Sequence, residues 1–288
     1  MVADMRDRLR ISDCPIVQRV ASHANWAQEG SSSSRRKAEE TGTWSRRLLD
    51  SVDGRGLKGV ADTPESSAWV GNGTRQLSGK DYVRAVKVRG NLLNTKVRAA
   101  RGRRVNNVNC DKCGRQPETL GHIMQRCSVL QAYRTKRHDV ALDLAITKMK
   151  EKGLSVLKEP PIPTSSGVRY PDVVVWNTDT NSSWVVDAKV VAYAAAGSLS
   201  DAHQRKVRYY NTQEIRTLVE RETGSTPEFG TITCSWRGVL ATETADLWSR
   251  LGLAKAGHKA IATHVVRASG RMHSSFHQIS GGAQNQPG

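Results

Sequence analysis

Long apolar runs are missing from this sequence. The longest, VVAYAAAG at residues 190–197, is far shorter than the roughly 20 residues needed to cross a bilayer. The first residues, MVADMRDRLRISD, are polar and lack the apolar core of a secretory signal. We therefore expect an intracellular protein that is neither secreted nor associated with a membrane.

Acidic residues are scarce relative to basic ones. The 288-residue chain has 27 Asp and Glu against 44 Lys and Arg, a formal net charge of +17. Such a surplus favours a polyanionic partner, above all nucleic acid. A membrane surface fits less well, because no long basic amphipathic helix carries Trp or Leu on its other face. A solvated basic surface or a ribosome-like tail is the alternative.

Cysteines are few and odd in number, and the common nucleotide-binding loops are absent. Three of the five cysteines lie within residues 110–127, a pattern unlike a disulfide framework and typical of a reducing compartment. Cys14 and Cys234 are expected to be free thiols. GNGTRQ lacks the third glycine of a dinucleotide loop, and GTRQLSGKD has the wrong spacing for a phosphate-binding loop.

The clustered cysteines have the spacing of metal ligands. In CDKCGRQPETLGHIMQRC, two residues separate Cys110 from Cys113, and His122 and Cys127 follow. Two thiolates on a tight turn, with a His and a Cys from the next helical turn, complete a tetrahedron around zinc. Such a closed set leaves no open position, so the predicted zinc is structural. Chance clustering or a redox pair is the alternative.

A basic helical segment precedes this cluster, from about residue 79. Val83, Val86, Leu93 and Val97 have helical spacing and are expected to share one face. The other faces carry basic residues that we predict to bind nucleic acid: Arg84, Lys87, Lys96, Arg98 and Arg101. A solvated surface helix explains the same pattern, and Gly90 weakens the helix.

Helices and strands alternate after the cluster. DVALDLAITKMKEKG predicts a helix closed by Gly153, and RYPDVVVWN and SSWVVDAKVVA predict two buried strands joined by TDTNSS. A long helix over 198–222, a strand at TITCSW and helices over 241–251 and 253–268 follow. Between residues 44 and 79, scattered apolar residues and many glycines predict loops with a few anchors.

Two aspartates on the predicted strands are candidate ligands of a hard cation. Asp187 and Lys189 point to the same side of their strand, and Asp172 lies on the neighbouring one. Two carboxylates suit Mg2+ or Mn2+, and Lys189 would orient or deprotonate a water for phosphodiester hydrolysis. A surface hairpin with an Asp187–Lys189 ion pair is the alternative.

Neighbouring segments add further candidates. Asp139, in RHD, supplies a third carboxylate or, more simply, caps the start of a helix, and His138 is expected to be a packed or solvent-facing residue. Lys206 with Tyr209 or Tyr210 lies on a helix expected to pack against the sheet, within reach of a phosphate. We select Tyr209 as the catalytic candidate, although a solvated role explains lone basic residues equally well.

Taken in order, these motifs resemble a known family. SAWV, SGKDYVRAVKVRGNLLNT, the Cys-Cys-His-Cys cluster with ETLGHIMQRC, RHD, PD, DAK and AHQRKVRYY follow one another over residues 68–211. This order is similar to the C-terminal region of non-LTR retrotransposon proteins that carry a restriction-like endonuclease. No YxDD or FxDD polymerase signature is present, so the chain is expected to be a fragment, a degenerate copy or a stand-alone nuclease.

The resemblance implies an α/β fold of the PD-(D/E)xK type, a restriction-endonuclease-like mixed sheet flanked by helices. From the composition and pattern of the residues we expect a disordered or linker segment at 1–43, a basic helical linker at 44–104 and a disordered tail at 271–288. Between them we expect a CCHC zinc knuckle at 105–130 and the endonuclease domain at 131–270. The resemblance also implies a reverse transcriptase in the full-length relative and a nuclear location. The implied partners are DNA and, as a further candidate, RNA of the element.

The activity implied is a metal-dependent nick in target DNA that serves retrotransposon integration by target-primed reverse transcription. By position, Asp172 and Asp187 match the family's metal-binding carboxylates. Many members use a lysine further along the chain than Lys189, so both Lys189 and Lys206 stay candidates. A catalytically silent zinc-knuckle protein that binds nucleic acid is the first alternative, and a scaffold for acidic proteins is the second.

Overall fold

The computed structural model describes residues 42–72, 75–192 and 198–279, and the chain divides into two compact units, Met1–Ser51 and Val52–Gly288. In the first unit, residues 42–50 are helical, with Trp44 and Leu48 exposed. Residues 44–50, which were expected to form a loop, are therefore helical. The rest of the segment expected to be disordered, residues 1–41, lies outside the described residues.

A four-stranded mixed sheet is the centre of the second unit. Its strands are β1 (Ser155–Lys158), β4 (Val173–Asn177), β5 (Ser182–Val191) and β6 (Pro227–Ser235), in the order β1-β4-β5-β6. The pairs β1–β4 and β4–β5 are antiparallel, and β5–β6 is parallel. The prediction of an α/β fold with a mixed sheet is confirmed, as are the three strands expected from the sequence.

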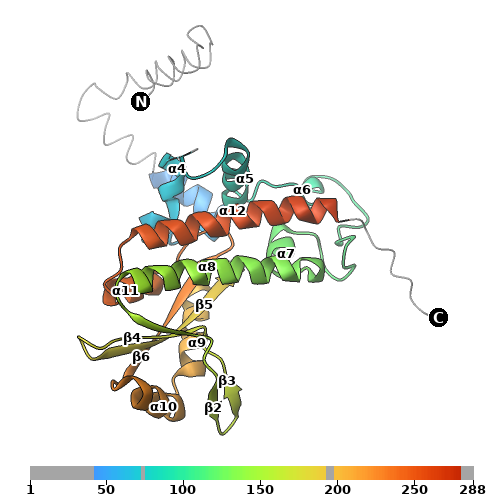
Figure 1. Cartoon of the computed structure of the whole chain (residues 1–288). Coiled ribbons are helices and arrows are strands. Elements are labelled where there is room, and N and C mark those ends of the chain that lie inside the picture. Colours follow the sequence, from blue (N-terminus) through green and yellow to red (C-terminus); the bar gives the residue numbers. More distant parts are fainter. Residues whose placement is uncertain (1–41, 73–74, 193–197, 280–288) are drawn as a thin grey trace, which may run out of the picture. The chain divides into compact units, whose positions relative to one another are not determined.

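The valine-rich strands bury both of their faces, because alternate residues point to opposite layers. Val173 pairs with Val186, and both pack into the main core with residues of α8 (Gln131–Glu151) and α12 (Ala256–Gln278). Val174 and Val185 face the other layer, where they contact Ile215 of α10 (Gln213–Thr223). Helices therefore cover both faces of the sheet, and α8 and α12 lie side by side (Figure 1).

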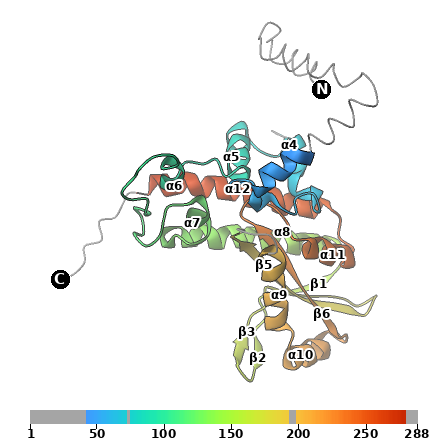
Figure 2. The same ribbon diagram turned by 180° about the vertical axis from the view of Figure 1, so that it is seen from behind.

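Three smaller features complete this part of the fold. The hairpin of β2 (Ile162–Thr164) and β3 (Gly167–Arg169) and helix α10 lie at the opposite end of the unit from α5 (Gly79–Arg89) and α6 (Lys96–Ala99) (Figure 2). Helix α9 (Ser198–Tyr210) packs on β6, as does α11 (Thr242–Arg250). A single helix over 198–222 was expected, but α9 ends at Tyr210, and Thr212 caps the separate helix α10.

Helix α8 ends as predicted but begins earlier. Gly153 follows its last turn with φ of 85°, a left-handed conformation that favours glycine. The helix starts at Gln131, well before Asp139. The prediction that Asp139 caps the helix is therefore wrong.

The segment before the cysteine cluster packs into a second core rather than forming a free linker. Its short elements are η2 (Arg55–Leu57), η3 (Pro64–Ser67), α4 (Ala68–Asn72), α5 (Gly79–Arg89) and α6 (Lys96–Ala99). Trp69, Val88 and Leu120 share this core with Phe276 of α12. Helix α7 (Leu120–Gln125) lies within the cysteine cluster and η5 (Ser128–Leu130) directly follows it. Cys110 and Cys127 belong to the same core, so the cluster shares a core with both flanking segments.

The buried face of α5 differs from the predicted one. Its buried residues are Asp81, Ala85 and Val88, whereas Val83 and Val86 are 54% and 41% exposed. Helix α12 passes close to α5 at Gly270, where an added Cβ would lie 3.1 Å from Cβ of Arg84. This close contact selects the small Ala85 side of α5 and leaves the two valines outside.

The C-terminal boundary also requires correction. Helix α12 continues to Gln278, eight residues beyond the expected end of the endonuclease domain at 270, so residues 271–278 are helical rather than tail. Residues 280–288 lie outside the described part of the chain. Among the described helices, none is both long and apolar enough to cross a membrane.

Candidate metal centre and candidate active site

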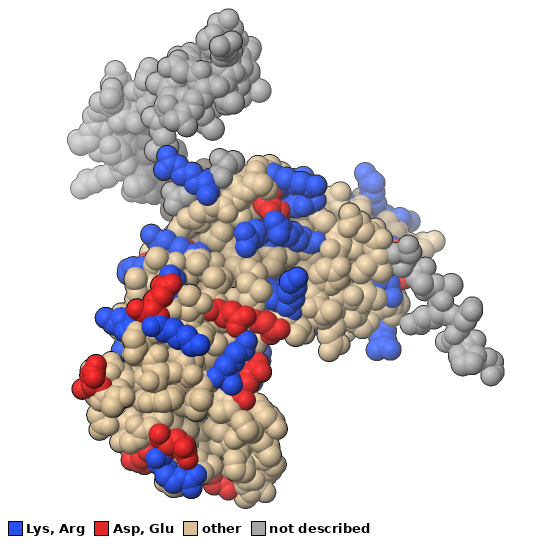
Figure 3. All heavy atoms as spheres, viewed as in Figure 1, with Lys and Arg blue, Asp and Glu red and all other residues tan. Residues whose placement is uncertain are grey.

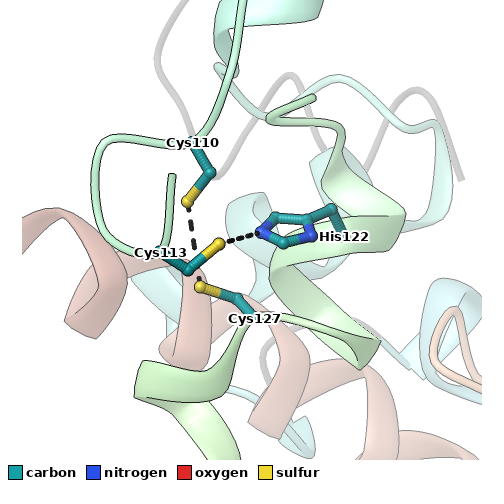
Figure 4. A group of neighbouring side chains, drawn as sticks. All are labelled: Cys110, Cys113, His122 and Cys127. Carbon is teal, nitrogen blue, oxygen red and sulfur yellow. Dashed lines mark hydrogen bonds between the residues drawn. The ribbon is translucent and has the colours of Figure 1, made fainter. Parts of the chain in front are cut away.

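The structure brings the four predicted metal ligands together. The Sγ atoms of Cys110, Cys113 and Cys127 and the ring of His122 place one ligand atom each within 4.8 Å of all the others. Sγ of Cys110 lies 3.8 Å from Sγ of Cys127, and Sγ of Cys113 lies 3.3 Å from Nε2 of His122 (Figure 4). Three sulfurs and one nitrogen in this arrangement suit a tetrahedral zinc ion.

Local sequence features build the cluster. Gly114, with φ of 66°, closes the turn after Cys113, and its amide donates to the carbonyl of Cys110 at 2.7 Å. Thr119 caps α7 by accepting from the amide of His122 at 3.0 Å. Oε1 of Gln116 lies 3.3 Å from Nδ1 of His122. A proton on Nδ1 for this bond leaves Nε2 free to bind a metal.

The electrostatics of the cluster favour a bound cation. Burial and the neighbouring Cys110 raise the pKa of Cys127 to about 12, and burial raises the pKa of Cys110. Burial lowers the pKa of His122, which keeps the imidazole neutral. The pKa of Cys113 is lowered instead, because hydrogen bonds from neighbouring amides and thiols outweigh its burial. A bound metal ion would displace the protons of the other two thiols. The residues present therefore fit a structural zinc site.

The two aspartates predicted as ligands of a hard cation also meet in the structure. Asp172 directly precedes β4, and its Oδ2 accepts from the amide of Ala188 on β5 at 2.6 Å. Asp187, one residue earlier on β5, is 3% exposed. Both carboxylates therefore lie at the point where β4 and β5 begin to separate.

Lys206 of α9, not Lys189, forms the ion pair with Asp187. Its Nζ donates to Oδ1 of Asp187 at 2.8 Å. Oδ2 of Asp187 is buried and has no hydrogen-bond partner among the described residues. Burial and the charge of Asp172 raise the pKa of Asp187, although Lys206 opposes this shift. A buried carboxylate oxygen without a donor is costly, and it fits an oxygen ligand for a hard cation.

His138 also lies beside these carboxylates, which the sequence did not indicate. Its Nδ1 lies 3.1 Å from Oδ1 of Asp139, and its Nε2 lies 3.1 Å from the carbonyl of Ala188 and 3.5 Å from Oδ2 of Asp172. The hydrogen bond with Asp172, followed by that with Asp139, raises the pKa of His138 to about 9 despite its burial. Asp139 therefore reaches Asp172 only through His138. The only signal in the sequence was that His138 precedes Asp139.

Lys189 and the tyrosines complete the surroundings. Burial lowers the pKa of Lys189, and the charges of Lys206 and Arg205 lower it further. Tyr209 is 50% exposed and its ring lies under the guanidinium of Arg169, 4.4 Å from the ring centroid. Tyr210 is buried and lies beside Lys206, whose Nζ is 5.5 Å from its ring centroid. The structure thus places Tyr210, rather than the selected Tyr209, beside the carboxylates.

The five basic residues predicted to bind nucleic acid divide into two groups. Nζ of Lys96 pairs with Asp111, while Arg98 and Arg101 both pair with Asp53, with nitrogen–oxygen distances of 3.1 and 2.6 Å. Arg84 and Lys87 lie on α5, where Arg84 is 3.9 Å from the carboxylate of Asp81 and Lys87 is exposed. In Figure 3 basic side chains predominate over the surface around α5 and α12, while acidic ones are more frequent near the sheet and α10.

Comparison with known proteins supports the family resemblance. No protein-family model matches the chain. The chain is 33% identical over 241 residues to the "Retrovirus-related Pol polyprotein from type-2 retrotransposable element R2DM" of Drosophila melanogaster. The aligned region covers 83% of this chain and 22% of that protein. The chain is 30% identical over 228 residues to the corresponding R2 polyprotein of Nasonia vitripennis, covering 77% of this chain and 22% of that protein.

A further relative is the R2 Pol polyprotein of Popillia japonica, which is 28% identical over 82% of this chain. The chain spans about a fifth of the length of the Drosophila and Nasonia relatives. The predicted resemblance to non-LTR retrotransposon proteins is confirmed at this level. The chain is a retrotransposon-derived region that is homologous, over about four-fifths of its length, to part of the R2 non-LTR retrotransposon Pol polyproteins.

Proposed function

We propose that this chain is a restriction-like endonuclease that nicks target DNA for retrotransposon integration by target-primed reverse transcription, with a structural zinc knuckle before its catalytic sheet. The observation that carries the proposal is the buried carboxylate of Asp187, whose Oδ2 has no hydrogen-bond partner among the described residues, with Asp172 bonded to the amide of the next residue, Ala188. The basic composition and the R2 relatives support nucleic acid as the substrate.

The two aspartates would hold a divalent cation such as Mg2+ or Mn2+ through their carboxylate oxygens. When bound, such an ion supplies a Lewis acid for the phosphate and lowers the pKa of a water. In the reaction, water oxygen bonds to phosphorus, the bond from phosphorus to the leaving oxygen breaks, and the water proton ends on that oxygen. The residues of the chain position the groups and move this proton.

The two lysines take different roles in this proposal. Lys206 carries a positive charge paired with Asp187, within reach of a phosphate oxygen. Lys189 has a lowered pKa because it is partly buried and lies near other cations, which makes it the better acceptor of the water proton. His138 positions Asp172 by bonding to it from α8.

Nicking of supercoiled plasmid with Mg2+ tests the proposal. The unmodified chain should convert it to the open-circular form, and Asp187→Ala should not. Asp179→Ala is the matched control, because Asp179 lies exposed on the turn between β4 and β5. Equal nicking by the unmodified chain and Asp187→Ala would refute the proposed site.

Binding measurements separate the alternatives. A silent nucleic-acid-binding protein would bind DNA with a steep salt dependence and cut nothing, whereas a scaffold for acidic proteins would show no preference for DNA. Mg2+ binding to the site gives an independent reading: it should raise the melting temperature of the unmodified chain and Asp179→Ala, but not that of Asp187→Asn. A missing Mg2+ shift in the unmodified chain would refute the carboxylate site even if nicking were observed.

In the cell, the proposal implies a nuclear protein that works with a reverse transcriptase, as in the longer relatives, and that has DNA and the RNA of its element as partners.

A further inference from the structure

A second site of different chemistry lies next to the cysteine cluster. A pocket of about 260 Å³ opens between residues 91–101, helix α7 and the end of β6. Among the described residues that line it, every side chain that can carry a charge, apart from the neutral His122, is an arginine: Arg55, Arg98, Arg101, Arg126 and Arg237. This is an environment for an anion.

Arg237 is the buried member of the set. It is 4% exposed, and its Nη1 donates to the carbonyl of Asp53 at 2.6 Å. Its Nε is also buried but has no hydrogen-bond partner among the described residues. The guanidinium lies over Gly56, where an added Cβ would be 3.0 Å from its central carbon. The guanidinium of Arg237 is therefore only partly satisfied by the described residues, and it places a buried positive charge in the wall of the pocket.

The remaining arginines leave a surplus of positive charge. Arg98 and Arg101 share a single carboxylate, that of Asp53. Both arginines thereby hold the pKa of Asp53 well below its usual range. Arg55 and Arg126 are exposed and form no ion pair with the described residues. Arginine recognises phosphate through paired N–H donors, so the net charge and the donor geometry both suit a phosphate group.

The other walls of the pocket are apolar. Leu93, Val97 and Leu120 line it together with Trp236. The volume lies slightly below the range of about 300–1,000 Å³ that is common for small-molecule pockets, so the pocket is far too small for a duplex. We propose that this pocket takes one nucleotide of a nucleic-acid strand, with its phosphate on the arginines and its base on the apolar wall. The proposal assumes the nucleic-acid substrate proposed above, but it does not depend on hydrolysis.

Gly121→Leu is the sharpest test, because it fills the pocket without changing charge. Gly121 lies in α7 and lines the pocket, and the nearest atom to an added Cβ is Oγ1 of Thr119 at 3.9 Å. The matched control is Gly79→Leu, where no atom lies within 4 Å of the added Cβ and which does not line the pocket. Zinc content of both variants shows whether the neighbouring His122 still binds metal.

The assay is fluorescence anisotropy of a labelled single-stranded oligonucleotide, without divalent cations. Losing one stacked base predicts about tenfold weaker binding by Gly121→Leu, with Gly79→Leu unchanged. In competition, adenosine monophosphate should displace the oligonucleotide at lower concentration than inorganic phosphate. Unchanged affinity in a zinc-loaded Gly121→Leu would overturn the proposal. Binding of the monophosphate without any effect on the oligonucleotide would assign the pocket to free nucleotides instead and also overturn it.

A charge-matched pair of variants tests the arginines. The double variant Arg55→Glu/Arg126→Glu should bind the oligonucleotide more weakly and with a smaller salt dependence. The control double variant Arg221→Glu/Lys150→Glu makes the same change in net charge away from the pocket and should have a smaller effect. Equal effects of the two double variants would mean that only overall charge matters. Because the binding assay does not depend on hydrolysis, failure of the unmodified chain to nick plasmid, with normal oligonucleotide binding, would count against the nuclease alone.

Discussion

Removing the charge of Lys206 should make the stability of the protein depend on pH. Lys206→Met keeps a side chain of similar length but removes the cation that lies 2.8 Å from the carboxylate of Asp187. Asp187 is 3% exposed, so solvent cannot replace the lost partner. Burial and Asp172 then act together to raise the pKa of Asp187, and the carboxyl must either remain charged and unpaired or take up a proton.

Protonation of Asp187 sets an upper limit on the loss of unfolding free energy in Lys206→Met. Protonating a carboxyl of ordinary pKa 3.8 at pH 7 costs about 1.4 kcal/mol for each pH unit, or about 4 kcal/mol in total. At pH 5 the same limit is about 1.6 kcal/mol. Because Lys206 is itself 30% exposed, the ion pair is partly screened, and we expect a loss of about 2 kcal/mol at pH 7.

The direction of the pH dependence follows from the direction of the pKa shift of Asp187. In the variant, the folded-state pKa of Asp187 is raised above that of the unfolded chain. The penalty is therefore absent below pH 3.8 and grows with pH until the raised pKa is passed. Urea unfolding at pH 5 and pH 7, without added divalent cations, measures this loss of stability in Lys206→Met.

Two further variants make the measurement decisive. Lys158→Met breaks an ion pair with Asp143 of similar length, 2.7 Å, between side chains that are 43% and 58% exposed, and should cost less than about 1 kcal/mol at either pH. Adding Asp187→Asn to Lys206→Met should recover most of the lost free energy of unfolding. An equal loss from Lys206→Met at pH 5 and pH 7, or no recovery in the double variant, would refute the reasoning.

Three further predictions concern other parts of the fold. Cys113→Ser should lose the zinc, expected at about one ion per chain, whereas the buried Cys234→Ser should retain it, as measured by elemental mass spectrometry. Burial lowers the pKa of His264 from 6.5 to about 4, so the free energy of unfolding should fall as pH drops below 6.5, by about 2 kcal/mol at pH 5; His264→Gln should abolish this part of the urea-measured slope. Gly257→Ala would place Cβ 2.3 Å from Trp248 and should cost about 1–3 kcal/mol in the same assay, with no loss expected if α12 shifts freely.

Features set by neighbouring residues were predicted well from the sequence. The four metal ligands lie within residues 110–127, so the spacing itself indicates the cluster. The valine-rich strands β4 and β5 are joined by a short turn, and their register places Val173 opposite Val186. Short loops leave few ways to pair such strands, which is why Asp172 and Asp187 could be placed together.

Features that depend on contacts between distant parts of the chain were not predicted from the sequence. Val83 and Val86 satisfy a helical apolar pattern, yet they are exposed because Gly270 of α12 draws the other side of α5 inward. The buried side of α5 carries Asp81, whose carboxylate pairs with Arg271 at 2.5 Å. No local pattern can reveal that an acidic residue will be buried when its partner lies 190 positions along the chain.

The tyrosine that borders the site depends on a similar detail. Tyr209 and Tyr210 are adjacent at the end of α9, and one residue along a helix turns a side chain by about 100°. Only the packing of α9 decides which ring faces the sheet. It buries Tyr210, whose hydroxyl donates to the carbonyl of Tyr170 at 2.8 Å, and leaves Tyr209 outside.

The two lysines show what the structure adds to a motif. Spacing alone places Lys189 on the same side of β5 as Asp187, which makes an ion pair between them the simplest expectation. Instead α9 supplies Lys206 to Asp187, and Lys189 lies partly buried near like charges that lower its pKa. A lysine that is partly buried among other cations releases and regains a proton more easily than a solvated one. The two side chains therefore differ in chemistry because of their surroundings, and exchanging their roles would require α9 to pack differently.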